Sequence, residues 1–304
     1  MIVTLHLGAH KTATTYLQEM LGANRAALCG AGVDFWPTPE FRQTVTPLLP
    51  RRTSAKRSKS AQQSHRADLR RVCAARLEQA QNRLMISDEN LLGTPQQIVE
   101  SGRLYPKLGG HLAAMADVLS GTAVEIFLCI RPLSDFGRSI FSEVLRHPND
   151  TLYEPEPFKA AWLEHAGSWV AVLEQIRALF PQSPITLWSF HQFRDLEPRI
   201  LQLMLGLDAL PDLDRSYVYR RPSLGHSAVE AMLAYGRAHG PMAMYENRAE
   251  IQAAHPRGKG DWIYRMWSEE ERQDLHGRFR QDMRAIRRLD WVTLLRPDDP
   301  PVGQ

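Results

Sequence analysis

The first eighteen residues of the chain constrain its fold more than any other segment. A largely apolar run from Ile2 to Leu7 ends at Gly8, and an amphipathic helix pattern begins near Thr14. A strand that leads through a tight loop into a helix points free backbone N–H groups and the positive end of the helix dipole at the loop. Lys11 adds a positive charge there, and neighbouring threonine hydroxyls add hydrogen-bond donors. This segment therefore predicts a site for phosphate or sulfate.

The spacing of this loop differs from that of nucleoside triphosphatases. Their loop reads G-x-x-x-x-G-K-[ST], and here its two glycine positions are occupied by Leu5 and His10. The loop instead resembles the 5′-phosphosulfate loop of sulfotransferases that use 3′-phosphoadenosine-5′-phosphosulfate (PAPS), with the spacing Gly8-x-x-Lys11-x-x-Thr14-Thr15. Many members of that family have glycine at the position of Ala13, and alanine adopts a positive φ less readily. The resemblance implies that PAPS is bound by Gly8, Ala9, His10, Lys11, Thr12, Ala13, Thr14 and Thr15. A simple strand–helix corner with an exposed lysine is the alternative.

A second motif lies further along the chain. The apolar, β-branched run from Ala123 to Ile130 predicts a buried strand, and a helix pattern follows it. Arg131 is therefore expected at the carboxyl end of a central strand, where open α/β sheets bind ligands. Sulfotransferases of this family hold the 3′-phosphate of PAPS with an Arg-x7-Ser pair in this setting, and arginine can grip a phosphate through two N–H groups. The resemblance thus assigns the 3′-phosphate to Arg131 and Ser139.

A third segment matches the same family more weakly. Residues 255–262 read His-Pro-Arg-Gly-Lys-Gly-Asp-Trp. They resemble the R-K-G-x-x-G-D-W segment that closes over the nucleotide in cytosolic sulfotransferases, with the glycine spacing compressed. The resemblance implies further nucleotide contacts from Arg257, Gly258 and Lys259. A glycine turn between two helices is the alternative.

Sulfuryl transfer needs a cation at the leaving phosphate and a base for the proton of the acceptor. We expect Lys11 to stabilise the charge that builds on the leaving phosphate oxygen. Glu89 is the leading candidate for the base, because it follows the predicted strand 83–87 at the same edge of the sheet as the loop. Glutamate or histidine occupies a comparable position in the sulfotransferases that this chain resembles. A cap of the next helix is the alternative role for Glu89. His10 is the second candidate base, because it flanks Lys11.

Strands alternate with helices along the chain. This order predicts a P-loop-like, three-layer α/β fold, with a central, mostly parallel sheet flanked by helices. A chain of 304 residues is long enough for a single domain of this kind, 1–304, and no internal repeat is visible. We expect strands at 2–7, 83–87, 123–130 and 185–188. We expect helices at about 14–28, 108–119, 136–145, 158–180 and 223–237, from about 193, and after a capping box formed by Ser268 and Glu271.

The positive charge of the chain is concentrated in one segment. Residues 51–71 contain eight basic residues and one acidic residue, out of 37 and 34 in the whole chain, so the remainder has a small excess of acids. The segment belongs to a basic, Pro-, Ser- and Gln-rich insertion at about 36–80. We interpret this insertion first as a solvated loop, and second as a lid that attracts an anionic acceptor, the nucleotide or a membrane surface. Residues 51–71 lack aromatic residues that could stack on bases, which argues against nucleic acid as a partner.

The remaining composition favours a cytoplasmic enzyme without a metal. No apolar run is long enough for a transmembrane segment, and the predicted first strand occupies the place of a signal peptide. The three cysteines are an odd number without C-x-x-C spacing and indicate reduced packing residues. The eleven histidines form no metal-binding motif.

These features together predict a PAPS-dependent sulfotransferase. It would move the sulfuryl group in line to a hydroxyl or amine of a carbohydrate, a lipid or a small metabolite, and release adenosine 3′,5′-bisphosphate. A P-loop kinase or other nucleotide phosphotransferase is the runner-up, and a non-catalytic nucleotide-binding relative is a third alternative. The sequence predicts neither the acceptor within these classes nor an oligomeric state.

Overall fold

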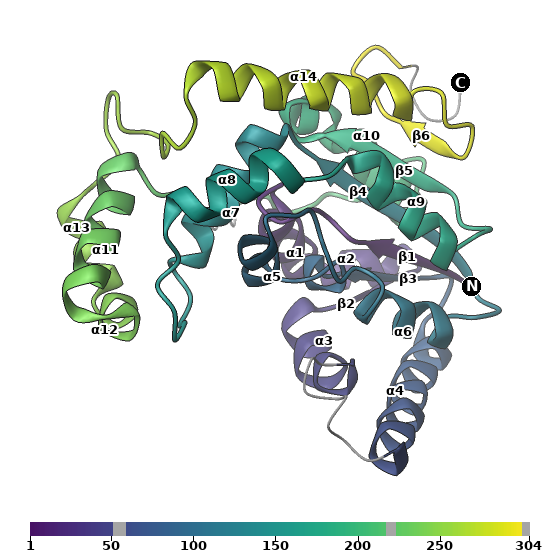
Figure 1. Ribbon diagram of the computed structural model, residues 1–304. Coiled ribbons are helices and arrows are strands. Elements are labelled where there is room, and N and C mark those ends of the chain that lie inside the picture. Colours follow the sequence, from purple (N-terminus) through teal and green to yellow (C-terminus); the bar gives the residue numbers. More distant parts are fainter. Residues whose placement is uncertain (51–58, 217–222, 300–304) are drawn as a thin grey trace.

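The computed structural model describes residues 1–50, 59–216 and 223–299 (Figure 1). Six parallel strands form one sheet in the order β2-β3-β1-β4-β5-β6, and helices flank the sheet. This arrangement confirms the predicted α/β class with a central parallel sheet. The strands are β1 (Ile2–His6), β2 (Val33–Trp36), β3 (Arg83–Ser87), β4 (Ala123–Ile130), β5 (Ile185–Ser189) and β6 (Val292–Leu294).

Helices connect the strands, as a parallel sheet requires. Those of the first half are α1 (Thr14–Ala23), α2 (Arg25–Gly30), α3 (Thr38–Thr44), α4 (Lys59–Gln79), α5 (Pro95–Ser101), α6 (His111–Val118) and α7 (Leu133–Val144). Those of the second half are α8 (Pro155–His165), α9 (Trp169–Leu179), α10 (Phe193–Leu205), α11 (His226–His239), α12 (Pro241–Glu246), α13 (Arg248–Ala254) and α14 (Glu269–Ile286). Short 3-10 turns include η1 (Thr46–Leu48), η3 (Glu89–Leu91) and η4 (Phe190–Gln192).

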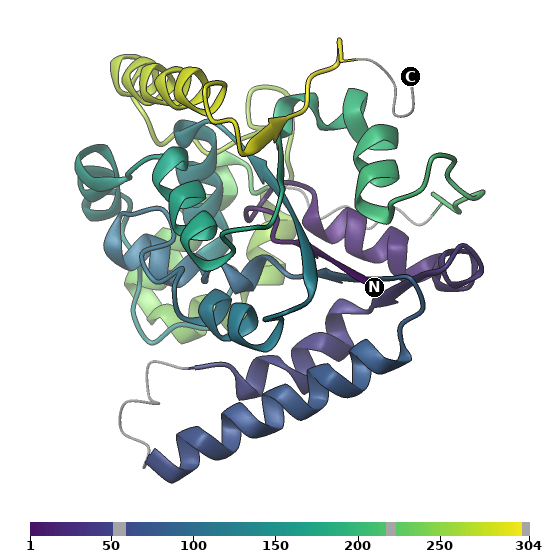
Figure 2. The same ribbon diagram turned by 90° about the vertical axis from the view of Figure 1, so that its right-hand side faces the viewer.

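Alternating side chains of the strands divide the core between the two faces of the sheet. On one face, Phe127 of β4 belongs to a buried cluster with Leu17 of α1 and Ile200 of α10. Figure 2 shows these two helices together on one side of the strands. On the other face, Ile126 of β4 belongs to a larger buried cluster that includes Ile140 of α7. The sheet is therefore the middle one of three layers.

The strand register brings the carboxyl ends of the central strands to one edge of the sheet. His6 of β1 lies opposite Ser87 of β3 and Phe127 of β4. Beyond this edge the chain continues from β1 into the loop before α1, from β3 into η3, and from β4 through Arg131 into α7. Three segments that are far apart in the sequence therefore meet beside β1, where the strand order reverses and open α/β sheets bind ligands.

The first predicted helix, 14–28, is two helices in the structure. The chain breaks at Asn24, whose side-chain amide donates to the carbonyls of Met20 (2.7 Å) and Asp214 (2.9 Å). Such a side chain competes with the helical hydrogen bonds of the backbone, which explains the division into α1 and α2. The sequence pattern did not predict β2 and β6, which have only four and three residues.

Two further helix boundaries differ from the prediction. The helix expected at 158–180 breaks at Gly167, which has a φ of 84°, and α9 starts afresh with a serine cap. The helix expected from Ser223 begins only at His226. There the carboxylate of Asp261, from a distant segment, accepts a hydrogen bond from the N–H of Ser227 (3.0 Å) and takes over the capping role.

The insertion at 36–80 contains more regular structure than the solvated loop that we expected. It holds the end of β2, then α3, η1 and the long helix α4. Leu69 and Cys73 of α4 are buried against the body of the protein. The loop interpretation is wrong for α4, because two apolar residues four positions apart give this helix a buried face. Residues 51–58, which contain several of the basic side chains, lie outside the described part of the chain.

Candidate active site

The loop between β1 and α1 has a backbone suited to anions. Gly8, Lys11 and Ala13 have positive φ values of 40°, 65° and 64°, and residues with positive φ help turn N–H groups toward one side of a loop. A Cβ atom at Gly8 would collide with the side chain of Thr14, so this position requires glycine. Ala13 is the N-cap of α1, and no side chain among the described residues caps this end of the helix. The N–H groups of the first helical turn are therefore left for a ligand.

Contacts with neighbouring segments fix the shape of this loop. The N–H of Ala9 donates to the carbonyl of Cys129 (3.2 Å), and the hydroxyl of Thr12 donates to the carbonyl of Ala9 (2.5 Å). The N–H of His10 donates to the buried hydroxyl of Tyr105 (3.0 Å). The Thr12 hydroxyl and the His10 N–H are thus engaged within the protein and constrain the conformation of the loop.

Arg131 joins the second sequence motif to the loop. Its Nη1 donates to the carbonyl of Lys11 (2.8 Å), and its guanidinium lies 5.0 Å from the ring centre of Phe190. Its own carbonyl accepts a hydrogen bond from Nε1 of Trp169 (3.0 Å). Burial lowers the pKa of Arg131 to about 10, so the group stays cationic at neutral pH. The structure thus brings together two motifs that are far apart in the sequence.

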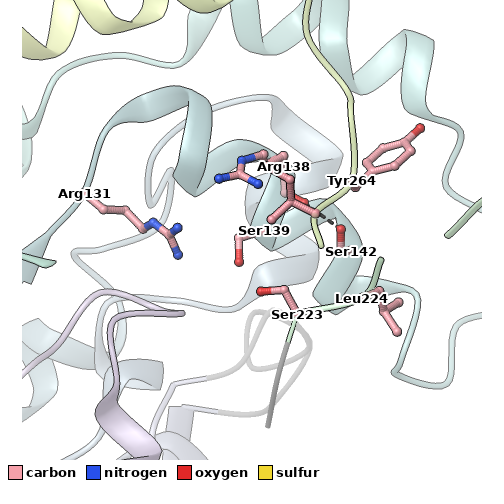
Figure 3. A pocket seen from close by; sticks show the side chains of 8 residues that line it. Arg131, Arg138, Ser139, Ser142, Ser223, Leu224 and Tyr264 are labelled. Atoms are coloured by element: carbon pink, nitrogen blue, oxygen red, sulfur yellow. Dashed lines mark hydrogen bonds between the residues drawn. The ribbon is translucent and has the colours of Figure 1, made fainter. Parts of the chain in front are cut away.

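Arg131 and Ser139 face one small cavity (Figure 3). The cavity has a volume of about 40 Å³, which is room for roughly three water molecules or the oxygen atoms of one phosphate group. Nε of Arg131 and Oγ of Ser139 are buried and have no hydrogen-bond partner within the described ranges. Because buried polar groups are almost always paired, two such donors beside one cavity make it a candidate site for a ligand with acceptor oxygens. The cavity is lined by Arg131, Arg138, Ser139, Ser142, Ser223, Leu224, Ile263 and Tyr264.

Lys11 is bound by a carboxylate that the sequence analysis did not single out. Nζ of Lys11 lies 3.0 Å from Oε2 of Glu143, and only 15% and 8% of the two side chains are exposed. Glu143 follows Ser139 by four residues, so both project from the same face of α7. That spacing is the only sequence signal for Glu143. It points to a contact with Lys11 only when the loop is known to lie beside α7.

Glu89 follows β3 at the carboxyl edge and is held by two side chains. Nη2 of Arg42 donates to Glu89 (2.9 Å) and to Asp88 (2.7 Å), and Nε2 of Gln18 donates to Glu89 (2.9 Å). Burial opposes the ionisation of Glu89, but the charge of Arg42 and the smaller contributions of neighbouring groups, including the hydrogen bond from Gln18, together outweigh it, and the pKa of Glu89 falls to about 2. Glu89 is therefore a weakly basic carboxylate while Arg42 is bound. No motif indicated Arg42 or Gln18, which come from α3 and α1.

His10 is buried beside Glu89, and both nitrogens of its ring are engaged. Nδ1 lies 3.2 Å from the hydroxyl of Tyr105, and Nε2 lies 3.2 Å from Oδ1 of Asn90. Burial lowers the pKa of His10, so the ring is neutral at pH 7. Because an amide oxygen only accepts hydrogen bonds, Nε2 carries the proton and Nδ1 accepts from Tyr105. In this state the ring fixes the loop and has no unoccupied nitrogen for the proton of an acceptor.

Residues 257–259 lie in an exposed turn between α13 and α14 (Figure 1). Nε of Arg257 donates to the carbonyl of Trp262 (3.1 Å), and the guanidinium lies 5.3 Å from the centre of that ring. In the part of the chain that the structure describes, these three residues form no hydrogen bond or ion pair with the loop before α1. Ile263 and Tyr264 from the same segment do reach the cavity. Nucleotide contacts of residues 257–259 stay a prediction.

Comparison with protein-family models identifies no matching family, and comparison with curated proteins finds no match. Across residues 1–50, 59–216 and 223–299, no group of three or more His, Cys, Asp or Glu side chains is arranged to hold a metal ion. No helix in the same ranges is long and apolar enough to cross a membrane. The function of the chain is therefore inferred from the geometry at the carboxyl edge of the sheet.

Proposed function

We propose that this protein is a PAPS-dependent sulfotransferase. The contact between Arg131 and the loop is the observation that carries the proposal, because it joins the loop to the cavity that Arg131 lines. The loop offers the N-terminus of α1 and Lys11, and the adjacent cavity offers Nε of Arg131 and the hydroxyl of Ser139. A nucleotide with phosphates on both its 3′ and 5′ positions would satisfy both sites at once. ATP has no 3′-phosphate to place in the cavity.

The residues at this edge can perform the transfer. PAPS would supply a sulfuryl group that is already activated by its bond to phosphate. Lys11 would neutralise the charge that grows on the phosphate oxygen as the sulfur–oxygen bond breaks. Glu89 would take the proton from the hydroxyl or amine that forms the new bond to sulfur. Arg42 must first leave Glu89, because a carboxylate with a pKa of about 2 is a poor base at neutral pH. The acceptor would be a carbohydrate, a lipid or a small metabolite.

Nucleotide binding tests this proposal directly. We expect adenosine 3′,5′-bisphosphate to raise the melting temperature without magnesium, and ATP with magnesium to have no comparable effect. The reverse result would contradict the proposal and favour a kinase or another phosphotransferase. Transfer of label from ³⁵S-PAPS to hydroxyl and amine acceptors tests catalysis. Binding of the bisphosphate without turnover on any acceptor would identify a nucleotide-binding relative without activity.

A further inference from the structure

We propose that Glu143 is a positioning residue that holds Lys11 back until an anion enters the loop. This inference rests on the function proposed above, in which Lys11 is the cation at the leaving phosphate. The ion pair of 3.0 Å between Lys11 and Glu143 is largely buried. Removing one partner from a buried pair is costly unless another charge replaces it. A phosphate or sulfate in the loop is such a replacement, and it releases Lys11 from the carboxylate.

Glu143 keeps an arginine and a histidine within reach when Lys11 leaves. Nη1 of Arg146 lies 3.6 Å from Oε2 of Glu143, and Nε2 of His147 lies 3.4 Å from Oε1. Both residues follow α7 directly and belong to the same turn of the chain as Glu143. The carboxylate therefore keeps a charged partner after the exchange, and it is not left as an uncompensated buried charge. Because of this second partner, Lys11 can leave Glu143 and return to it with only a small change in free energy.

The position of Glu143 on α7 links the exchange to nucleotide binding. Ser139 and Glu143 project from one face of the helix, four residues apart. A nucleotide whose 3′-phosphate reaches Ser139 places its 5′-group at the loop, close to the pair of Lys11 and Glu143. The negative charge of the 5′-group attracts Lys11 and repels Glu143, and both forces favour the exchange.

Calorimetry on the variant E143Q tests the proposal. Glutamine keeps the shape of the side chain without its charge, so Lys11 no longer has to leave a carboxylate. We expect E143Q to bind adenosine 5′-monophosphate and adenosine 3′,5′-bisphosphate about tenfold more tightly than the wild type. Adenosine 3′-monophosphate, which needs only Arg131 and Ser139, should bind almost unchanged. The ligand-free variant should melt at a lower temperature, because Lys11 has lost the charge of its carboxylate partner. A residue that only stabilises the fold would lower the melting temperature without tightening any ligand.

The matched control is E125Q, which changes the net charge equally at the opposite edge of the sheet. Glu125 pairs with Arg83 at 2.6 Å, and its substitution should leave all three nucleotide affinities unchanged. The proposal is overturned if E143Q tightens all three nucleotides equally, or none of them. Inorganic pyrophosphate separates this inference from the proposed function. If the wild type binds pyrophosphate but no nucleotide, the sulfotransferase proposal fails, yet E143Q must still bind pyrophosphate more tightly. If it does not, or if neither protein binds any of these anions, the role of Glu143 is refuted.

Discussion

Two arginines lie at opposite edges of the sheet, and their surroundings differ. At the amino edge, Nη1 of buried Arg83 donates to the hydroxyl of Thr4 (2.5 Å) and to Glu125 (2.6 Å), and the Thr4 hydroxyl donates to the carbonyl of Met204 (2.8 Å). At the carboxyl edge, Arg131 binds one loop carbonyl, and its buried Nε has no partner among the described residues. A complete polar network stabilises a fold, whereas an incomplete one keeps donors for a ligand.

The backbone shows the same contrast. At the amino edge the positive φ of 65° belongs to Gly206, where a Cβ atom would press against the guanidinium of Arg83. At the carboxyl edge two of the positive φ values belong to Lys11 and Ala13, for which this conformation costs about 1–2 kcal/mol each. Strain of this kind persists where it shapes a functional site. The comparison therefore separates an edge with paired polar groups and a glycine at its positive φ from the edge for which we propose ligand binding.

The largest expected effect is on the reaction rate at the carboxyl edge. The substitution Glu89→Gln keeps the hydrogen-bonding shape of the side chain but removes its ability to take a proton. Loss of a general base lowers the rate by about 10²–10⁴. The loss should be larger for an aliphatic alcohol than for a phenol whose hydroxyl is already acidic, as measured by turnover on both acceptors. Equal losses on the two would indicate damage to the fold, and near-normal turnover on the alcohol would place the base elsewhere.

The next effect is on nucleotide affinity. Arg131→Ala removes charge-assisted hydrogen bonds to the 3′-phosphate, each of which contributes about 1.5–3 kcal/mol. We expect adenosine 3′,5′-bisphosphate to bind about 10–100-fold more weakly. The affinity for adenosine 5′-monophosphate should fall much less. The free energy of unfolding without ligand should fall by about 1 kcal/mol, because Arg131 loses its hydrogen bond to the carbonyl of Lys11 and its contact with Phe190. Calorimetry that finds equal losses for both nucleotides would show that Arg131 does not read the 3′-phosphate.

The opposite pattern is expected for the arginine at the amino edge. Arg83→Met keeps most of the apolar stem but leaves Glu125 and the hydroxyl of Thr4 without their donor. Because Glu125 is 30% exposed, we expect a loss of about 2 kcal/mol in the free energy of unfolding, less than for a fully buried pair. Urea unfolding measures this loss, and nucleotide affinity should not change. A variant that folds normally but binds nucleotide poorly would refute the division between the two edges.

The parts of this site that could be predicted are those formed by residues that are adjacent in the sequence. The run 123–130 is apolar almost throughout and matches β4 residue for residue, so its pattern alone was enough to place Arg131 at a strand end. The loop before α1 could be predicted for the same reason, but the positive φ of Ala13 could not, because alanine adopts it less readily than the glycine found in many members of the family. The position of a residue can be predicted from sequence when it depends only on the residues next to it in the chain.

The parts that could not be predicted depend on how distant segments approach one another. Arg42 lies near the start of what the sequence suggested was an insertion, and it reaches Asp88 and Glu89 only because α3 packs beside the end of β3. Glu143 and Tyr105 become site residues only when α7 and the segment after α5 contact the loop. Contacts between distant segments leave no periodic pattern in the sequence. For Glu89 such a contact, with Arg42, makes the expected base a weakly basic carboxylate.

The smallest expected effect is the pH dependence of stability that Arg42 imposes. The pKa of Glu89 in the fold, about 2, lies below its ordinary value of 4.5. Ionised Glu89 therefore stabilises the fold above about pH 4.5, and this contribution is lost as the pH falls toward 2.

Asp88 acts in the opposite direction, because burial raises its pKa and its protonation favours the fold as the pH falls. The two effects oppose each other, so the net change in the free energy of unfolding is smaller than Glu89 alone would give. Urea unfolding of the wild type and of Arg42→Met at pH 7 and pH 3 measures it. We expect the wild type to exceed Arg42→Met in free energy of unfolding by more at pH 7 than at pH 3. At pH 7 ionised carboxylates attract the guanidinium of Arg42. An advantage that stays constant or grows at pH 3 would mean that Arg42 does not control the ionisation of Glu89.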